Sequence, residues 1–430
     1  MKKFRSAIAA VVTAGLLTTV FATAATSAGA AGSAANGVTD TTVTLAYPEI
    51  DFAALKDVGV NLDRGNTQQI FDALVEEINS KGGIDGRQVK VNVVKYNLLN
   101  PASAESACIT MTEDQKVFAV LDAFAGTVAS SNKCITDHKT FLVGGDPDPA
   151  IAAKTPWVGQ FPSTARRSTL LVDLLKKGGK LKGKTIAVIS NQTDAEIAKK
   201  VMVPALKKAG TPAKVVLVDD APAGDVAAVD ANYQVFVEKM KAEGVDQVIF
   251  VGSEVSAGFS RLITNGFDVP VATPNADQLE TIGKNQTQNP PSSYNGALTI
   301  GGMAGQETFK QPEIQKCVKT FNAKHPDITV KSPELVPEGQ PDWATGIIIA
   351  CNQLELFQAI ADKAGKDLNN DTVLAAIKSM TQNFAYGSNP YNTFGPTKFD
   401  APNGFRLMKY DAAVGKTGGL VGIGKIQNLG

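Results

Sequence analysis

Catalytic residues are scarce in this sequence of 430 residues, which contains two histidines and four cysteines. Neither a GxSxG nor an HExxH motif occurs, and the histidines, His138 and His325, stand at a predicted helix end and in a predicted turn. Nucleophilic catalysis needs a nucleophile with a nearby base, and metal catalysis needs a cluster of ligands. Because neither pattern occurs, we expect a protein that is not an enzyme and that holds no cofactor and no metal.

An excess of charge of one sign is also missing, since 42 basic residues balance 42 acidic ones. The chain has no basic tract. Proteins that bind nucleic acid through its phosphate backbone carry a basic surface. We therefore expect no nucleic-acid partner.

A long apolar run occurs only at the N-terminus. Basic residues at positions 2, 3 and 5 precede an apolar stretch from Ala7 to Ala22, and small residues follow it. This order is typical of a secretory signal peptide, and the run of about 16 residues is shorter than the roughly 20 that span a bilayer. Cleavage sites after Ala24 and Ala30 both fit the small-x-small rule, and we favour the second.

Residues 1–30 are therefore predicted to be a signal peptide and residues 31–40 a polar linker. No cysteine lies near the cleavage site, where a lipoprotein would carry one. We expect an exported protein that is periplasmic or secreted and that meets a membrane only through a partner. A second apolar segment, Ile347–Cys351, is interrupted by Asn352 and Glu355 and is predicted to belong to a buried amphipathic helix.

Export makes disulfide bonds the expected state of the four cysteines. Four cysteines allow three pairings. We expect Cys108–Cys134 and Cys317–Cys351, because each pair is local and each member lies on or beside a predicted helix. A zinc site is the alternative, but no pair has the CxxC spacing and only two histidines are available to assist.

Short apolar strands alternate with amphipathic helices along most of the chain, a pattern typical of parallel sheets covered on both faces. One series spans residues 41–161 and includes the apolar run Val117–Gly126, which is predicted to be a buried strand. A second series spans residues 162–301, and the last third is rich in helices and is expected to complete both units. We predict an α/β protein whose N-terminal lobe contains residues 41–161 and about 302–398, and whose C-terminal lobe contains residues 162–301 and about 399–430.

Two glycine-rich segments resemble nucleotide-binding motifs, but each leads from a predicted helix into a strand, whereas such motifs lead from a strand into a helix. Gly82, Gly83 and Gly86 follow a predicted helix and precede a strand, whereas a dinucleotide site needs the opposite order. The segment Gly178–Thr185 matches the phosphate-loop pattern but also leads from a helix into a strand. Gly82 or Gly83 is expected to end the helix in the left-handed conformation, and Asp85 and Gly86 to form the turn into the strand.

Three segments resemble type I periplasmic solute-binding proteins of ABC importers, the branched-chain amino acid and amide group. The most specific is INSKGGIDGRQVKV (Ile78–Val91), in which a helix end is followed by Gly-Gly-Ile, a polar residue, Gly-Arg and a strand. KVFAVLDAFAGTVASS (Lys116–Ser131) resembles the third strand and its binding loop, and FGPTKFDAPNGFR (Phe394–Arg406) resembles a C-terminal segment of the family. Many secreted members also carry a disulfide at the positions of Cys108 and Cys134.

The resemblance covers the chain from about Thr41 to Leu429 and implies two Rossmann-like lobes joined by three crossover segments. Such proteins close on a small molecule and present it to the membrane subunits of an ABC transporter. Two facing sheets suit this role, because ligands bind beyond the carboxyl ends of parallel strands. The implied ligand is a small polar solute, an amino acid or amide-like compound. The alternatives are an extracellular sensor of the same fold and a secreted hydrolase, which would need the nucleophile–base pair that the sequence lacks.

In the first lobe, the resemblance implies that the loop after the third strand supplies a hydroxyl group and backbone amides to a ligand carboxylate. This role carries over to Thr127 and Ser130, and the alternative for Ser130 is that it caps the next helix. The following loop contains Gly145, Asp146 and Asp148, where the family usually has a small residue followed by Ser or Thr. The two aspartates either bind an amine or are turn residues beside prolines.

In the second lobe, the candidates again follow predicted strands. They are polar residues at three strand ends: Asn191 and Asp194, Ser253 and Glu254, and Asn275 and Asp277. Carboxylates bind ammonium groups, so Glu254 or Asp277 is expected to meet a cationic part of the ligand. Tyr47, at the end of the first strand, is expected either to pack against an apolar part of the ligand or to belong to the core.

Overall fold

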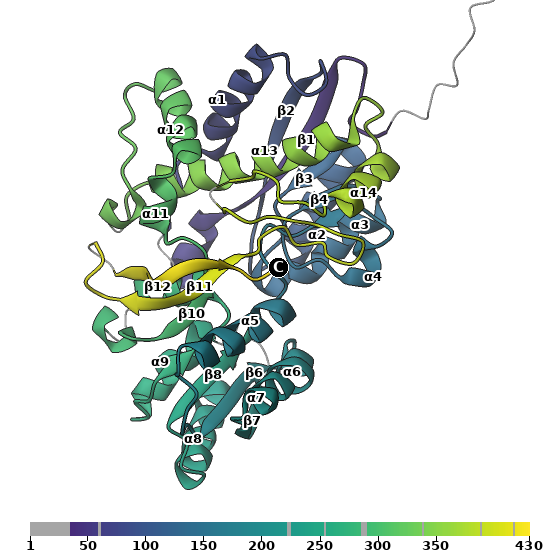
Figure 1. The fold of residues 1–430 in the computed structure, drawn as a ribbon. Helices are drawn as coiled ribbons and strands as arrows, with labels where there is room; N and C mark the ends of the chain where they lie inside the picture. Colours follow the sequence, from purple (N-terminus) through teal and green to yellow (C-terminus); the bar gives the residue numbers. More distant parts are fainter. Residues whose placement is uncertain are drawn as a thin grey trace, which may run out of the picture. The chain divides into compact units, whose positions relative to one another are not determined.

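The computed structural model describes residues 35–58, 62–221, 225–252, 255–284, 290–337, 339–387, 389–415 and 418–430 (Figure 1). The predicted signal peptide and most of the predicted linker lie outside these ranges. Two sheets organise the described chain, and helices connect the parallel strands of each sheet.

The first sheet has five parallel strands in the order β2-β1-β3-β4-β5. Its strands are β1 (Thr42–Ile50), β2 (Gln88–Tyr96), β3 (Ala119–Leu121), β4 (Phe141–Val143) and β5 (Trp157–Val158). The helices that follow them in the chain are α1 (Thr67–Ser80), α2 (Pro101–Ile109), α3 (Asn132–Asp137) and α4 (Pro149–Ala152). Every residue of β3 and β4 is buried, as their apolar sequences predict.

The turn between α1 and β2 confirms the predicted role of the glycines. Gly82 and Gly83 have φ angles of +100° and +70°. A Cβ atom on Gly83 would lie 1.8 Å from the Arg87 carbonyl oxygen, so only glycine fits there. Asp85 and Gly86 follow with φ angles of +49° and +81° and form the tight turn into β2. These glycines therefore end a helix and do not bind a phosphate.

The second sheet has seven strands in the order β12-β11-β10-β9-β8-β6-β7. They are β6 (Ile186–Asn191), β7 (Ala213–Asp219), β8 (Gln247–Val251), β9 (Val271–Ala272), β10 (Leu298–Gly301), β11 (Gly404–Asp411) and β12 (Gly419–Asn428). β6 to β10 are parallel, whereas β11 is antiparallel to β10 and β12 is antiparallel to β11. The sequence does not predict β12, because glycines at positions 419, 422 and 424 interrupt its alternation.

Helices also surround the second sheet. They are α5 (Thr164–Lys177), α6 (Ala195–Ile197), α7 (Val203–Ala209), α8 (Val226–Ala242), α9 (Val255–Thr264) and α10 (Ala276–Lys284). Helix α5 leads through Gly178 towards β6, so the segment that matches a phosphate loop connects a helix to a strand, as predicted.

The last third of the chain adds helices to the first sheet. They are α11 (Gly305–Phe309), α12 (Pro312–Lys324), α13 (Trp343–Ala364) and α14 (Asn370–Ser379). Figure 1 shows α13 beside the strands of the first sheet, and the Phe357 ring lies 6.2 Å from those of Phe118 and Phe141. By length and composition α13 resembles a membrane span, but 61% of its apolar window is buried in the protein. We therefore interpret it as the core helix that the sequence predicts.

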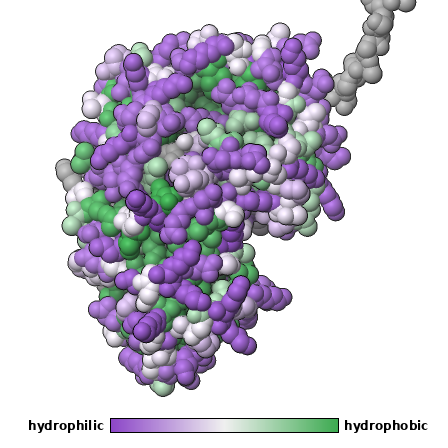
Figure 2. Space-filling view, in the orientation of Figure 1, coloured by the Kyte–Doolittle hydropathy of each residue, from purple (hydrophilic) through white to green (hydrophobic). Residues whose placement is uncertain are grey.

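Three hydrophobic cores follow this arrangement. The core of the first sheet contains buried residues from Val43 to Val158 and again from Ile314 to Ala401. The two cores of the second sheet contain residues from Leu170 to Ala304 and again from Phe405 to Leu420. The chain thus crosses between two lobes three times: after β5, after β10 and before β11. This is the predicted fold class, while the residue limits of the lobes stay a prediction. Hydrophilic side chains cover most of the face in Figure 2.

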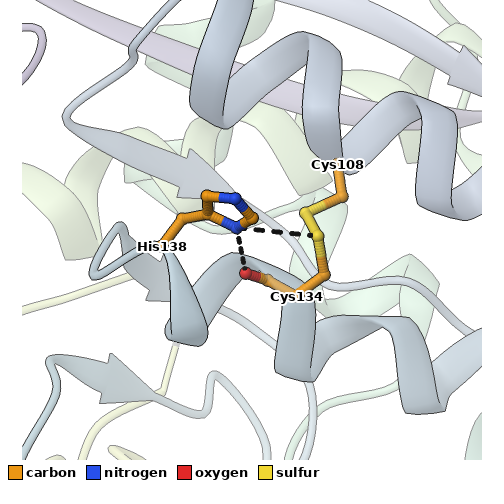
Figure 3. A group of neighbouring side chains, drawn as sticks. All are labelled: Cys108, Cys134 and His138. Atoms are coloured by element: carbon orange, nitrogen blue, oxygen red, sulfur yellow. Dashed lines mark hydrogen bonds between the residues drawn. A yellow bond between two sulfur atoms is a disulfide. The ribbon is translucent and has the colours of Figure 1, made fainter.

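Both predicted disulfide bonds are present. Cys108–Cys134 joins α2 to α3, and Cys317–Cys351 joins α12 to α13, with sequence separations of 26 and 34 residues. Figure 3 shows the first bond beside the imidazole ring of His138. Each bond fastens two helices that cover the first sheet.

Removal of the Cys317–Cys351 bond in the double variant Cys317→Ser, Cys351→Ser is expected to lower the free energy of unfolding by about 3 kcal/mol, because the bond restricts the unfolded chain. Urea denaturation followed by circular dichroism measures the change. The matched variant Cys108→Ser, Cys134→Ser is expected to lose the same amount within about 0.5 kcal/mol, since the two loops are of similar length. Unchanged unfolding midpoints in both variants would contradict this stabilising role.

Candidate ligand-binding site

The carboxyl ends of the parallel strands identify the candidate site. Ligands of open α/β sheets bind where the strand order reverses. In the first sheet this point lies between β1 and β3, since β1 pairs with β2 on its other side. In the second sheet it lies between β6 and β8. One aspartate stands at each point, Asp122 after β3 and Asp194 after β6.

The backbone holds Asp122 in a strained conformation. Its φ angle is +96°, which is unusual for a residue other than glycine. Its N–H donates to the Val143 carbonyl oxygen at 2.7 Å, and a Cβ atom on Gly144 would lie 2.8 Å from the Asp122 Cα. Oδ1 of Asp122 accepts a hydrogen bond from the Ala123 N–H at 2.8 Å. The carboxylate is therefore fixed at the edge of the sheet.

The surroundings of Asp122 favour a proton on its carboxylate. Burial raises the pKa of Asp122 to about 6, against the lowering effects of the Ala123 N–H, Arg64 and the Tyr47 hydroxyl group. Asp277, from the second lobe, raises this pKa. Tyr47 is buried against Phe71, with 5.0 Å between the ring centroids, and burial raises its pKa. Tyr47 thus belongs to the core, and its hydroxyl group lowers the pKa of Asp122.

The sequence did not lead us to Asp122, because the predicted strand Val117–Gly126 ran through it. That strand prediction is wrong in length: β3 ends at Leu121, and Asp122 turns the chain away. An ionisable residue in the middle of an apolar run is the signal that marks the strand end.

Asp194 occupies the corresponding point of the second sheet. Its N–H donates to Oδ1 of Asn191 at 2.8 Å. Its carboxyl group lies against Gly252, where a Cβ atom would be 1.9 Å from Asp194 Oδ2. Asn275, which follows β9, donates through Nδ2 to the Gly252 carbonyl oxygen. The structure thus brings together Asn191, Asp194 and Asn275, which the sequence predicts as candidates.

Arg167 and Asp277 extend this edge. Arg167 lies in the first turn of α5, where its Nη2 donates to Thr164 Oγ1 at 3.3 Å. Burial lowers the pKa of Arg167, while nearby carboxylates, chiefly that of Asp277, raise it. Asp277 is exposed; desolvation raises the pKa of its carboxylate, and Arg167 and Arg64 lower it. We refer to Arg64, Asp122, Arg167, Asp194 and Asp277 as the inter-lobe charge cluster.

Two polar atoms beside this cluster lack partners within the described chain. They are Nε of Arg167, a donor, and Oδ1 of Asn275, an acceptor on a residue that is 7% exposed. A buried polar atom without a hydrogen bond costs about 1–3 kcal/mol. A ligand that supplies the missing acceptor and donor would remove this penalty.

Asp146 and Asp148 make the contacts of turn residues. Asp146 Oδ2 accepts a hydrogen bond from the Thr164 N–H at 2.8 Å, at the start of α5. Asp148 caps α4 by accepting from the N–H groups of Ala150 and Ile151 at 2.8 and 3.1 Å. Gly145 has a φ angle of +68° and forms the turn before them. Their predicted contact with a ligand stays a prediction.

The remaining candidates lie elsewhere or outside the described chain. Ser130 is exposed in the 3₁₀ segment η3 (Gly126–Ser131) and lines a surface depression of about 290 Å³ with residues of α2 and α3. It does not cap α3, whose N-cap residue is Ser131. The side chain of Thr127, and Ser253 and Glu254 as a whole, lie outside the described residues, so their roles stay predictions.

Two groups of side chains have the composition of a metal site: Cys108 and Cys134 with His138, and Cys317 and Cys351 with Glu355. In both groups the sulfur atoms are joined in a disulfide bond and offer no thiolate. Figure 3 shows the hydrogen bond between the His138 ring and the Cys134 carbonyl oxygen. Nδ1 of His138 lies 2.8 Å from that oxygen, and Nε2 lies 2.7 Å from Glu113 Oε1. Both ring nitrogens are therefore occupied, and we interpret this group as structural.

Arg166, next to Arg167, holds the first and third crossover segments together. Its guanidinium group is paired with Asp400 and donates to the Pro402 carbonyl oxygen at 2.9 Å and to Asn403 Oδ1 at 2.7 Å. A cavity of about 280 Å³ beside it is lined by Lys398, whose pKa burial lowers to about 8. The two consecutive arginines thus differ. Protein oxygen atoms accept hydrogen bonds from the Arg166 guanidinium group, whereas Nε of Arg167 meets no acceptor within the described chain.

A family model described as periplasmic binding protein matches residues 65–419. The chain belongs to the periplasmic binding protein family. This periplasmic binding protein has the type I fold. Family membership implies an extracytoplasmic location.

Solved structures share this fold at low sequence identity. A fatty acid ABC transporter substrate-binding protein from Thermomonospora curvata is 18% identical, with a TM-score of 0.63 and coverage of 92% of this chain and 94% of that one. A solute-binding protein from R. palustris in complex with 4-hydroxybenzoate is 14% identical, with a TM-score of 0.63 and coverage of 90% and 98%.

A substrate-binding protein from Desulfitobacterium hafniense in complex with Leu is 14% identical, with a TM-score of 0.57 and coverage of 90% and 99%. A search of curated proteins finds no match. The structural likenesses establish the fold of this periplasmic binding protein.

The substitution Asp122→Asn is expected to stabilise the protein above about pH 6 by up to about 3 kcal/mol. The pKa of Asp122 is about 6 in the folded protein, against about 3.9 in an unfolded chain. The stability that its proton contributes is therefore fully present below about pH 4 and is lost as the pH rises through about 6. Asparagine cannot ionise and tolerates a positive φ angle.

Urea denaturation between pH 4 and pH 8 measures this difference. The control is Asp85→Asn, the same substitution at an exposed turn residue with a φ angle of +49°. A stability gain that is equally large at every pH would show that Asp122 does not carry the proton.

Proposed function

We propose that this periplasmic binding protein captures a small polar solute, an amino acid or amide-like compound, between its two lobes and delivers it to an ABC permease. The observation that carries the proposal is the inter-lobe charge cluster. Its carboxylates and guanidinium groups come from both lobes and stand where α/β sheets bind ligands. A wholly apolar solute would leave these groups desolvated without partners, whereas a polar solute supplies partners.

The descriptions of the structural neighbours support a solute with a carboxylate group. One neighbour is described as a fatty acid ABC transporter substrate-binding protein, and two others are complexes with Leu and with 4-hydroxybenzoate. These solutes differ in size and shape but share a carboxylate. In this chain Arg167 is suited to such a group, because a guanidinium donates two parallel hydrogen bonds to a carboxylate.

Binding between lobes provides the signal for transport without any chemical step. A ligand shifts a conformational equilibrium only by its difference in affinity for the two states. A solute that contacts Asp122 in one lobe and Arg167 in the other makes both contacts only when the lobes are close together. Membrane subunits that recognise the closed arrangement would then receive loaded protein.

The predicted signal peptide, residues 1–30, supports export of the protein. An exported substrate-binding protein meets its solute outside the cytoplasmic membrane, in the periplasm or after release. The two disulfide bonds are consistent with this oxidising environment.

Thermal-shift screening against amino acids, amides, urea, aromatic acids and fatty acids tests the function, because a bound ligand raises the melting temperature by mass action. At least one polar solute is expected to raise it by several degrees, which is about what a ligand at 100 times its Kd would cause. No shift with any solute class would contradict the proposed function.

Isothermal titration calorimetry of Arg167→Gln then tests the carboxylate contact. Affinity for a carboxylate solute is expected to fall about 10- to 100-fold, because a charged hydrogen bond is lost. The control is Arg261→Gln on α9, whose Nε donates to Asp230 at 2.7 Å, and its affinity is expected to equal that of the wild type. Equal affinity of both variants would show that Arg167 does not bind the solute.

A further inference from the structure

The Cys108–Cys134 disulfide bond has a third metal-binding type of side chain beside it. Sγ of both cysteines and a ring nitrogen of His138 all lie within 4.8 Å of one another. Figure 3 shows the imidazole ring facing the sulfur atom of Cys134. In the oxidised protein the bond is structural and offers no thiolate. Reduction changes this, because it leaves two thiols at the same place.

Helix α3 places two of the three ligand atoms together. Cys134 and His138 are four residues apart, and the His138 N–H donates to the Cys134 carbonyl oxygen at 3.2 Å, so both side chains lie on one face of the helix. Nδ1 of His138 lies 3.8 Å from Cys134 Sγ. Tetrahedral zinc, with Zn–S bonds of about 2.3 Å and Zn–N bonds of about 2.0 Å, places such atoms about 3.5 Å apart. The two atoms therefore already have nearly the spacing that one zinc ion requires.

Helix α2 supplies the other sulfur atom. The Cα atoms of Cys108 and Cys134 are 6.4 Å apart, and because the two sulfur atoms meet in the disulfide bond, both reach the space beside His138. Two thiolates on tetrahedral zinc are about 3.8 Å apart. Once the bond between them is gone, rotation of the side chains about their Cα–Cβ bonds gives this separation. The two helices thus hold three ligands in place before a metal ion arrives.

Glu113, in the π-helical segment η2 (Thr110–Asp114), gives the histidine an outer partner. Nε2 of His138 lies 2.7 Å from Glu113 Oε1. A histidine that binds a metal through one ring nitrogen usually donates its other N–H to a carboxylate, which fixes the orientation of the ring. Nδ1 donates to the Cys134 carbonyl oxygen at 2.8 Å in the oxidised protein. Metal binding exchanges this hydrogen bond for a metal–nitrogen bond.

A surface depression gives an ion access to the sulfur atoms. Cys134 lines a depression of about 290 Å³ together with the acidic residues Glu105 and Asp137. Lys133 pairs with Asp137 there, and the carboxylate of Glu105 adds a negative charge that attracts cations. The depression also has room for a water molecule as the fourth ligand. Three protein ligands and one water are a coordination that zinc accepts.

We propose that the reduced Cys108–Cys134 pair and His138 form a binding site for Zn²⁺, and that formation of the disulfide bond abolishes this site. Two thiolates and an imidazole favour zinc over Mg²⁺ and Ca²⁺, which take oxygen ligands. The site belongs to the first lobe alone and is independent of the proposed solute site.

A balanced reaction links the two states. A dithiol reductant transfers two electrons and two protons to the disulfide bond and itself becomes a disulfide. Zn²⁺ then displaces both thiol protons and the proton on Nδ1 of His138. A disulfide oxidant that takes up two electrons restores the Cys108–Cys134 bond, removes both thiolates and releases the ion. The state of this bond therefore decides whether the protein holds zinc.

Cobalt absorption tests the site in the reduced protein. A phosphine reduces the protein without adding a thiol, and Co²⁺ replaces Zn²⁺ as a spectroscopic probe. The double variant Cys317→Ser, Cys351→Ser is expected to bind one Co²⁺ per chain with thiolate-to-cobalt absorption in the near ultraviolet, and Zn²⁺ is expected to displace it. The matched variant Cys108→Ser, Cys134→Ser is expected to lack this site, and oxidised wild-type protein is expected to show no such absorption.

Single variants assign the ligands by competition between Co²⁺ and Zn²⁺. Glu113→Gln is expected to keep the absorption spectrum but to lower Zn²⁺ affinity about 10- to 100-fold, because it orients the ring without touching the ion. A larger fall is expected for His138→Asn, in which a ligand is lost. The control is His325→Asn, the only other histidine of the sequence, whose ring lies 4.7 Å from that of Phe321. Its affinity is expected to equal that of the parent protein.

Circular dichroism keeps the test decisive where reduction unfolds the protein. Zn²⁺ is then expected to restore the folded spectrum, since its binding energy becomes folding energy. Folded, reduced protein without the absorption, or unfolded protein that Zn²⁺ does not refold, would overturn the inference. Equal affinities of His138→Asn and His325→Asn would overturn the role of His138. Solute binding by the oxidised protein is measured separately, so the proposed function does not depend on these results.

Discussion

The close approach of the Gly144 backbone to that of Asp122 determines the shape of the site. Because Gly144 has no side chain, the Asp122 N–H reaches the Val143 carbonyl oxygen, and the chain leaves β3 after three residues. A non-glycine residue at a φ angle of +96° costs of order 1–3 kcal/mol. The buried strands on either side hold it there. The result is a carboxylate held at the reversal point of the first sheet, where a flexible loop would have left it solvated.

The start of α5 gives the second lobe its part of the site. The helix begins directly after the first crossover, so its first turn lies where the two lobes meet. Arg166 uses this position to bind Asp400, Pro402 and Asn403, and thereby ties the crossovers together. Arg167 instead lies close enough to several carboxylates, chiefly that of Asp277, for them to raise its pKa. One helix turn therefore carries both the connection between the lobes and the group that we assign to the solute carboxylate.

The sequence predicts the alternation of strands and helices and the order in which they connect. It does not predict which residues adopt a strained backbone conformation. The alternation of strands and helices predicts the fold class, and the local spacing of the cysteines predicts both disulfide bonds. The order of helix, glycines and strand predicts that Gly82 and Gly83 end a helix and bind no phosphate. Because ligands bind beyond the ends of parallel strands, the sequence predicts Asn191, Asp194 and Asn275 as candidates. The structure brings these three residues together at the carboxyl edge of the second sheet. The sequence analysis did not identify Asp122 as a site residue, because apolar residues continue beyond it. It did not identify Arg167, because that residue lies on a helix. Both depend on close backbone approaches and crossovers, which periodicity does not encode.

The site concentrates several terms that oppose folding. This region contains a strained backbone, carboxylates whose pKa is raised, and two polar atoms that have no partner among the described residues. The cores on both sheets and the disulfide bonds supply the stability that tolerates them. A polar solute that supplies an acceptor to Arg167 and a donor to Asn275 would relieve part of this cost. Ligand binding and stability are then linked through the same groups, and a protein built in this way is stabilised most when it is loaded.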